Sequence, residues 1–158
     1  MAKPFYSLDT SGLLDGWVRY YPPATFPTLW TNIEDLIDEG RLIATEEVFM
    51  ELSKQGDDEI MQWCKSRKET LFLAIDSWIQ IRVGEILATH PNLVDVGKGR
   101  SGADPFVIAL AEMRSCTVVT GETPSNKPLK PRIPDVCKDR GVKHCTFLEM
   151  IQQELWKF

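Results

Sequence analysis

Four acidic residues stand where apolar segments of the sequence end or begin. Asp9 follows the run FYSL, Glu51 lies in TEEVFMEL, and Asp104 opens GADPFVIALA. Glu122 comes two residues after the run CTVVT. A buried carboxylate costs several kcal/mol unless it is hydrogen-bonded or meets a cation. These four positions are therefore the candidates for chemistry, provided that the fold brings them together.

Each acid taken alone has a plainer explanation. Asp9 and Asp104 could each cap a following helix. Glu51 shares one helix face with Glu47, and both could be solvated. Glu122 could be an ordinary loop acid. The elements that carry these residues must therefore decide whether they form a site.

Short apolar runs alternate with segments of helical periodicity along the chain. The runs predict strands at 5–8, 42–44, 116–120 and 142–145, and the periodic segments predict helices at 13–21, 28–39, 45–54, 56–68, 76–88, 102–115, 134–140 and 147–156. Gly40 and Gly141 stand where helix C-caps place glycine, and Thr45 stands where an N-cap is expected. The proline-rich segment 121–134 should be irregular.

This alternation predicts an α/β fold with a parallel sheet and helices on both faces. In such a sheet the functional crevice lies at the carboxyl ends of the strands. Separate elements then deliver their acids to one edge of the sheet. That convergence favours a site over four unrelated caps and surface residues.

Length and composition predict one globular domain spanning residues 1–158. The chain is 43% hydrophobic and 26% charged, with a mean hydropathy of −0.19. Its apolar runs are far shorter than the roughly 18 residues of a membrane span. Residues 1–12 have no apolar stretch of the kind found in secretory signals, so we expect a cytoplasmic protein with four reduced cysteines.

The formal net charge of −5 taken alone argues against binding to nucleic acid. The average hides an asymmetry, because residues 127–143 hold six basic side chains against two acidic ones. Without the four candidate acids the net charge would be −1. The acidic composition therefore does not exclude RNA as a partner.

The motifs LDTS, TEEVFMEL, GADPFVIALA and VVTGE, in this order, resemble the PIN-domain nucleases. The resemblance is to the PIN-like branch of toxins in prokaryotic toxin–antitoxin pairs, including DUF4411-like proteins, and it spans about residues 6–149. It implies a three-layer α/β/α sandwich with a mostly parallel central sheet. It also implies a carboxylate pocket that holds Mg²⁺ or Mn²⁺ for phosphodiester hydrolysis.

The resemblance assigns a role to each matching residue. Asp9 matches the first acid and Ser11 the hydroxyl that accompanies it. Glu51 matches the helix glutamate that precedes a leucine, and Asp104 matches the acid that opens the central helix. Glu122 falls where many members have aspartate. These four acids are the implied metal ligands and catalytic residues.

The sequence departs from the family pattern after Glu122. Residues 123–126 supply no second acid or aromatic there, so Asn126 or Asp135 could share the role of the fourth ligand. Glu47, one turn before Glu51, could support that residue or replace it. The residue types suit the implied chemistry, because Mg²⁺ needs one or two direct carboxylates besides water and substrate phosphate.

Two basic segments could guide an RNA substrate. One is the GKGRSG run with Lys98 and Arg100, and the other holds Lys127, Lys130 and Arg132. Each could equally be a solvated connection.

The sequence thus predicts a metal-dependent endoribonuclease, the toxin of a toxin–antitoxin pair, that forms a homodimer and binds a cognate antitoxin protein. Two alternatives stay open: a catalytically weak PIN-like binding or scaffold module, and a DNA-directed nuclease.

Overall fold

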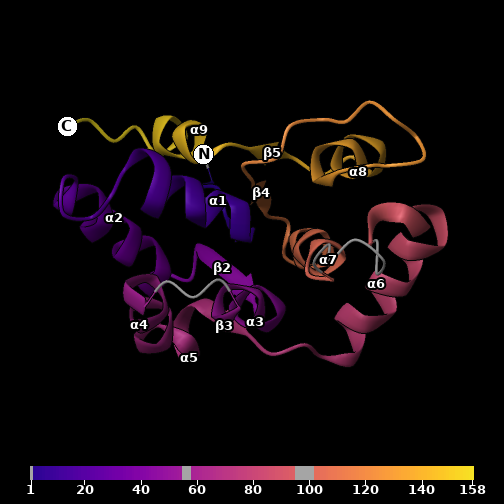
Figure 1. Cartoon of the computed structure of the whole chain (residues 1–158), viewed down its shortest axis with the longest axis horizontal. Helices are drawn as coiled ribbons and strands as arrows, with labels where there is room; N and C mark the ends of the chain where they lie inside the picture. Colours follow the sequence, from indigo (N-terminus) through magenta and orange to yellow (C-terminus); the bar gives the residue numbers. More distant parts are fainter. Residues whose placement is uncertain (1, 55–57, 95–101) are drawn as a thin grey trace.

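The computed structural model describes residues 2–54, 58–94 and 102–158. Within these ranges the chain forms one parallel sheet of five strands (Figure 1). The strands are β1 (Tyr6–Leu8), β2 (Leu42–Thr45), β3 (Phe72–Leu73), β4 (Thr117–Val119) and β5 (His144–Cys145). Their order is β3-β2-β1-β4-β5, with Tyr6 opposite both Leu42 and Thr117. β1 is therefore the central strand, with β2 and β3 on one side of it and β4 and β5 on the other.

Helices connect and cover these strands. They are α1 (Thr10–Leu14), the π-helix η1 (Asp15–Tyr20), α2 (Pro27–Asp38), α3 (Glu46–Ser53), α4 (Asp58–Ser66), α5 (Lys68–Leu71), α6 (Ser77–Thr89), the 3₁₀ helix η2 (Pro91–Leu93), α7 (Asp104–Arg114), α8 (Ile133–Arg140) and α9 (Phe147–Gln153). The α/β prediction is confirmed: the protein is a three-layer α/β/α sandwich around an all-parallel sheet.

The alternation of side chains along β1 separates the two outer layers. The Tyr6 hydroxyl donates to Glu154, just after α9, while the Ser7 hydroxyl donates to the carbonyl of Val107 in α7. Successive residues of a strand point to opposite faces, so α9 and α7 cover different faces of the sheet. Figure 1 shows α1 and α2 beside α9, and α6 beside α7.

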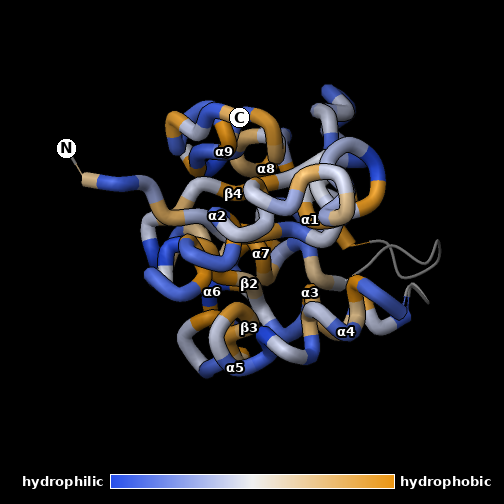
Figure 2. Tube along the Cα trace, turned by 90° about the vertical axis from the view of Figure 1, so that its left-hand side faces the viewer, coloured by the Kyte–Doolittle hydropathy of each residue, from blue (hydrophilic) through white to orange (hydrophobic). Residues whose placement is uncertain are grey.

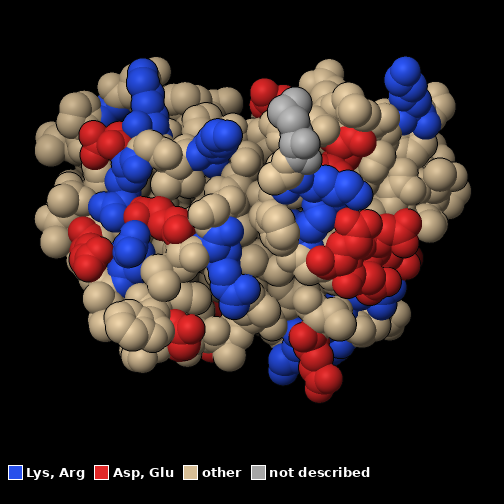
Figure 3. Space-filling view, turned by 180° about the vertical axis from the view of Figure 1, so that it is seen from behind, with Lys and Arg blue, Asp and Glu red and all other residues tan. Residues whose placement is uncertain are grey.

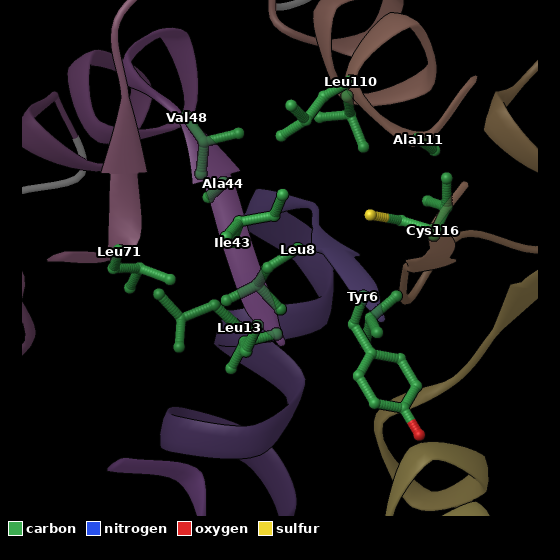
Figure 4. Close-up of a cluster of buried hydrophobic side chains, with 14 of the residues drawn as sticks. Tyr6, Leu8, Leu13, Ile43, Ala44, Val48, Leu71, Leu110, Ala111 and Cys116 are labelled. Atoms are coloured by element: carbon green, nitrogen blue, oxygen red, sulfur yellow. The ribbon is translucent and has the colours of Figure 1, made fainter. Parts of the chain in front are cut away.

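The core lies between these layers. Figure 2 shows the hydrophobic stretches gathered at the strands and at α7, with the hydrophilic ones outside. In Figure 4, Leu8 and Leu13 lie together on one side of the sheet, while Ile43 and Leu110 lie on the other. Leu8, Leu13 and Leu110 are buried almost completely. Burial of this apolar surface stabilises the sheet that positions the site.

Glycines end two of the helices as predicted. Gly40, after α2, and Gly141, at the end of α8, have φ angles of +72° and +71°, which favour glycine. Thr45 is the N-cap of α3, but its hydroxyl makes no capping bond and is buried without a hydrogen-bond partner among the described residues. The position of this cap was predicted correctly, whereas its bond was not.

Several elements differ from the sequence prediction. β3 was not predicted, and the expected helix over 56–68 is α4 followed by the separate short helix α5. Part of the predicted helix over 13–21 is a π-helix. β5 is only two residues long. Local periodicity carries little information on such short elements, because tertiary pairing decides them.

No helix in the described part of the chain is long and apolar enough to cross a membrane. All four cysteines are buried free thiols.

Candidate functional site

The order of the strands creates a switch point between β1 and β4. The chain leaves β1 toward β2 on one side, and it later enters β4 on the other side. In open parallel sheets, ligands bind in the crevice outside the carboxyl ends of the strands at such a point. Asp9 follows β1 and Thr120 follows β4, and the Asp9 N–H donates to the carbonyl of Val119 at 2.9 Å. The fold therefore brings the ends of these two motifs together.

Asp9 lies at this switch point and is only 2% exposed. Its Oδ2 atom accepts hydrogen bonds from the hydroxyls of Ser11, at 2.5 Å, and Thr120, at 3.0 Å. Although Asp9 occupies the N-cap position of α1, its side chain makes no capping bond. The cap explanation for Asp9 is therefore wrong, and its carboxylate belongs to the switch point.

The two hydroxyls also hold the backbone that follows β4. Ser11 Oγ accepts the N–H of Gly121 at 2.9 Å, and Thr120 Oγ1 accepts the N–H of Glu122 at 3.1 Å. Ser11 thus accompanies Asp9, as the resemblance implies. Thr120 was not among the predicted site residues, although its place at the end of an apolar run could have indicated it.

Burial raises the pKa of Asp9 to about 6. The hydrogen bond from Ser11 lowers this pKa, the negative charge of Glu122 raises it, and the hydrogen bond from Thr120 lowers it again. The charged form of Asp9 is therefore costly in the metal-free protein, even with two hydroxyl donors.

Glu51 is half-buried in α3 and interacts electrostatically with Asp9 and Glu122. Burial and the negative charge of Asp9 raise its pKa to about 7, the Thr10 hydroxyl lowers it, and Glu122 raises it further. Glu47, one turn earlier, is also half-buried. The structure thus brings Glu51, Asp9 and Glu122 within electrostatic reach of one another.

Glu122 also has a structural partner. Its Oε2 accepts the N–H of Ile133, the first residue of α8, at 3.1 Å. This bond closes the loop over 122–133. Glu122 therefore contributes negative charge to the site while it holds the start of α8.

Asp104 is half-buried and is the first residue of α7. Asp104 therefore opens the helix as expected, and the plainer explanation that it caps the helix is wrong, because the N-cap is Ala103. Because α7 leads into β4, its C-terminus lies at the amino edge of the sheet and its N-terminus at the carboxyl edge. This direction places Asp104 at the same edge as Asp9.

Asp135 organises the loop before α8. Its carboxylate accepts backbone N–H groups from Ser125, Asn126 and Arg132 at 2.8–3.1 Å. Burial raises its pKa, but these hydrogen bonds outweigh burial and the pKa is lowered overall. Asn126 is exposed with a φ of +56°. Asp135 therefore holds the backbone of this loop at the start of α8.

Two of the three basic residues of this loop are exposed, and the third, Arg132, is half-buried. Lys127 and Lys130 are exposed, and the guanidinium of Arg132 lies 3.4 Å from the carbonyl and the hydroxyl of Thr123. Lys98 and Arg100 lie outside the described residues.

Asp15, at the start of η1, is a further acid near the switch point that the sequence did not indicate. A Cβ atom on Gly121 would lie only 2.3 Å from Asp15 Oδ2, so the Asp15 carboxylate packs directly against Gly121. Its other oxygen, Oδ1, lies 3.2 Å from Nη1 of Arg19.

In the described part of the chain, no group of three or more His, Cys, Asp or Glu side chains is arranged to hold a metal ion. Negative charge is also found elsewhere: Figure 3 shows acidic side chains gathered on one side of the rear face. Lys and Arg are interspersed with acids over the rest of that face.

The parallel sheet, its strand order and its two helical layers define a three-layer α/β/α sandwich that fits the PIN-like fold. A family described as a domain of unknown function, DUF4411, matches residues 6–158, and the chain belongs to this family. A crystal structure of FitAcB from Neisseria gonorrhoeae has a similar fold, with a TM-score of 0.54 and 15% sequence identity. The match covers 91% of this chain and 99% of the other. No curated protein matches the sequence significantly.

Proposed function

We propose that the protein is a divalent-cation-dependent endoribonuclease and the toxin of a toxin–antitoxin pair. The observation that carries the proposal is the burial of Asp9 at the switch point, where the charge of Glu122 raises the pKa of Asp9 and the charge of Asp9 raises that of Glu51. A buried carboxylate beside two others is costly unless a cation neutralises it.

The donor set suits Mg²⁺ or Mn²⁺. Asp9, Glu51, Asp104 and Glu122 offer carboxylate oxygens, which hard cations prefer. A preformed ring of three ligands is not required, because Mg²⁺ keeps several waters and takes further oxygens from substrate phosphate. Glu51 and Glu47 are on the same helix, so a rotamer change could exchange one for the other.

When bound, the cation would neutralise charge on the phosphodiester and lower the pKa of an attacking water. The chain's own residues do the positioning. Ser11 and Thr120 orient Asp9 through its Oδ2 atom, and both hydroxyls also hold the backbone of residues 121 and 122. Glu51, whose pKa is raised to about 7 in the metal-free protein, would be held in its charged form beside the cation.

RNA is favoured as substrate by the basic loop beside Glu122. Lys127 and Lys130 are exposed on the segment that Glu122 and Asp135 hold in place. The resemblance of the sequence motifs to PIN-like toxins supports an antitoxin partner. The fold that the chain shares with FitAcB is consistent with this resemblance.

Substitution of the acids tests this function. Asp9→Asn and Asp104→Asn should each abolish Mn²⁺-dependent RNA cleavage with the fold intact, because both keep the shape and remove the charge. Glu51→Gln should behave likewise, while Glu47→Gln should reduce activity less. Nearly full activity in purified Asp9→Asn or Asp104→Asn protein would show that the site is wrong. A reversed order of the two glutamates would assign the helix ligand to Glu47.

A second candidate, a PIN-like scaffold without catalysis, is favoured by two observations. Glu122 already accepts the N–H of Ile133, and no ready-made metal cluster exists among the described residues. Thermal unfolding with and without Mn²⁺ separates the two functions. A cation that binds only the native state raises the melting temperature, whereas a scaffold should show no shift.

We also propose that the protein forms a homodimer. Trp78 and Ile81 lie one turn apart on α6 and are 67% and 57% exposed. Large exposed apolar groups of this kind mark interaction surfaces. Sedimentation at micromolar concentration should show a dimer, and a strict monomer would contradict the proposal.

A further inference from the structure

The π-helix η1 carries a cation to the rim of the carboxylate site. The Asp15 carboxylate packs against Gly121, the residue between Thr120 and Glu122. Its other oxygen holds Arg19 at 3.2 Å. The guanidinium is therefore separated from the Asp9 network by a single acidic side chain.

Tight packing fixes this arrangement. A Cβ atom on Gly16 would lie 2.5 Å from the ring of Phe147, so η1 contacts α9 as closely as its backbone permits. The N–H of Tyr21 donates to the carbonyl of Gly16, five residues earlier, which is the π-helical pattern. Single-turn π segments occur frequently at functional sites.

Arg19 itself faces solvent. Its side chain is 66% exposed, whereas that of Asp15 is 14% exposed. An exposed ion pair of this type contributes little to stability, so folding does not account for the position of Arg19. A guanidinium presents five donors in a fork that matches phosphate oxygens, and the bond to Asp15 uses one nitrogen.

The residues beside Arg19 add apolar and aromatic surface. Val18 is 52% and Tyr20 61% exposed, and the Tyr20 ring lies 6.3 Å from that of Tyr21. Exposed aromatic rings next to cations are the features that bind single-stranded nucleic acid, through stacking on bases and contact with phosphates.

We propose that Arg19 binds a phosphate of a single-stranded RNA substrate at the rim of the site, and that Asp15 is a positioning residue that holds it there. This inference rests on the proposed function, because it assigns a substrate contact to that same site. Tyr20 supplies a stacking surface for the neighbouring base.

The test compares Arg19→Gln with Arg114→Gln. Arg114 is exposed at the far end of α7, an 11-residue helix that spans roughly 16 Å, so it is a matched control. Both variants are assayed for cleavage of a short single-stranded RNA with Mn²⁺ over a range of salt concentrations. Mn²⁺ binding and thermal unfolding are measured in parallel.

Arg19→Gln should raise KM about tenfold with little change in kcat, as expected for the loss of one charge-assisted hydrogen bond. The slope of log kcat/KM against log salt should become less steep by about 0.7, the value for one phosphate contact on a single strand. Arg19→Lys should recover part of the loss, since it restores the charge without the fork. Asp15→Asn should give an intermediate KM. Mn²⁺ affinity should not change.

Two results would overturn the assignment in distinguishable ways. If the wild-type protein binds Mn²⁺ and cleaves RNA while Arg19→Gln matches Arg114→Gln, the role of Arg19 is wrong and the proposed function stands. If the wild-type protein neither cleaves nor binds RNA, both are wrong.

Discussion

At the scale of single residues, the raised pKa of Asp9 shows that its charged form is unfavourable in the metal-free site. Two hydroxyls donate to one of its oxygens, yet its pKa still rises to about 6 because burial and Glu122 oppose the charge. Structural carboxylates of this protein behave differently. Glu112 is also part-buried, but hydrogen bonds from Arg140 and Arg82 outweigh burial and lower its pKa. Among the described residues no cation pairs with Asp9, and the proposed metal would supply that positive charge.

The raised pKa values predict how stability depends on pH. Asp9 and Glu51 have ordinary values of 3.8 and 4.5 and folded values of about 6 and about 7, so folding favours their protonated forms. The free energy of unfolding of the metal-free protein should therefore fall as pH rises from about 4 to about 7, by up to about 3 kcal/mol from Asp9.

Urea unfolding at pH 5, 6, 7 and 8 measures this effect. An Asp9→Asn, Glu51→Gln double variant should lose the decline relative to wild type, and saturating Mn²⁺ should suppress it in wild type. Groups with a lowered pKa, such as Asp135, lose their contribution to the free energy of unfolding only in more acidic solution. They therefore do not affect the decline expected between about pH 4 and about pH 7. Parallel profiles for the two proteins would contradict the prediction.

At the scale of elements, the sequence predicted correctly those features that depend on neighbouring residues alone. The C-cap glycines and the strand before Asp9 follow from residue type and pattern. β3 has two residues and cannot show an alternating pattern, because it is formed by pairing with β2. The π-helix likewise has no pattern of its own, and its position depends on the contact between Gly16 and Phe147. The sequence therefore predicted a helix over 13–21 but not that the part of it that carries Arg19 is a π-helix.

Two glycines in helical segments should respond oppositely to the same substitution. In Gly16→Ala the new methyl group would meet the Phe147 ring, so we expect a loss of about 1–3 kcal/mol from overpacking. A Cβ on Gly84 in α6 meets nothing within 4 Å, so Gly84→Ala should stabilise the protein by up to about 1 kcal/mol. Urea unfolding of both variants checks this. Equal effects would mean that the contact with Phe147 does not hold η1 in place.

At the scale of the whole molecule, the sheet explains which site residues could be anticipated. A parallel sheet gathers the ends of its strands, so Asp9 and Glu122 could be expected at one edge from strand order alone. The hydrogen bonds of Glu122 to Ile133 and of Asp135 to the loop depend on where α8 folds back. Sequence spacing carries no such information, which is why Asp135 was a candidate ligand before its role as a loop cap was visible.

The charge distribution of the whole molecule leads to a last prediction. The net charge is −5, yet three basic side chains stand on the loop that Asp135 and Glu122 hold beside the site. If Lys127, Lys130 and Arg132 meet RNA phosphates, replacing all three with Gln should weaken RNA binding. The slope of its salt dependence should fall by about 2, because fewer counterions are released.

The control for this variant replaces Lys3, Arg114 and Lys143 with Gln. These three exposed residues stand just before the strands β1, β4 and β5, at the amino edge of the sheet. The control has the same net charge as the loop variant, so a difference between the two reports position and not total charge. Mn²⁺ affinity should be equal in both. An equal salt slope in the two variants would make the loop a plain connection and leave Arg19 as the proposed phosphate contact.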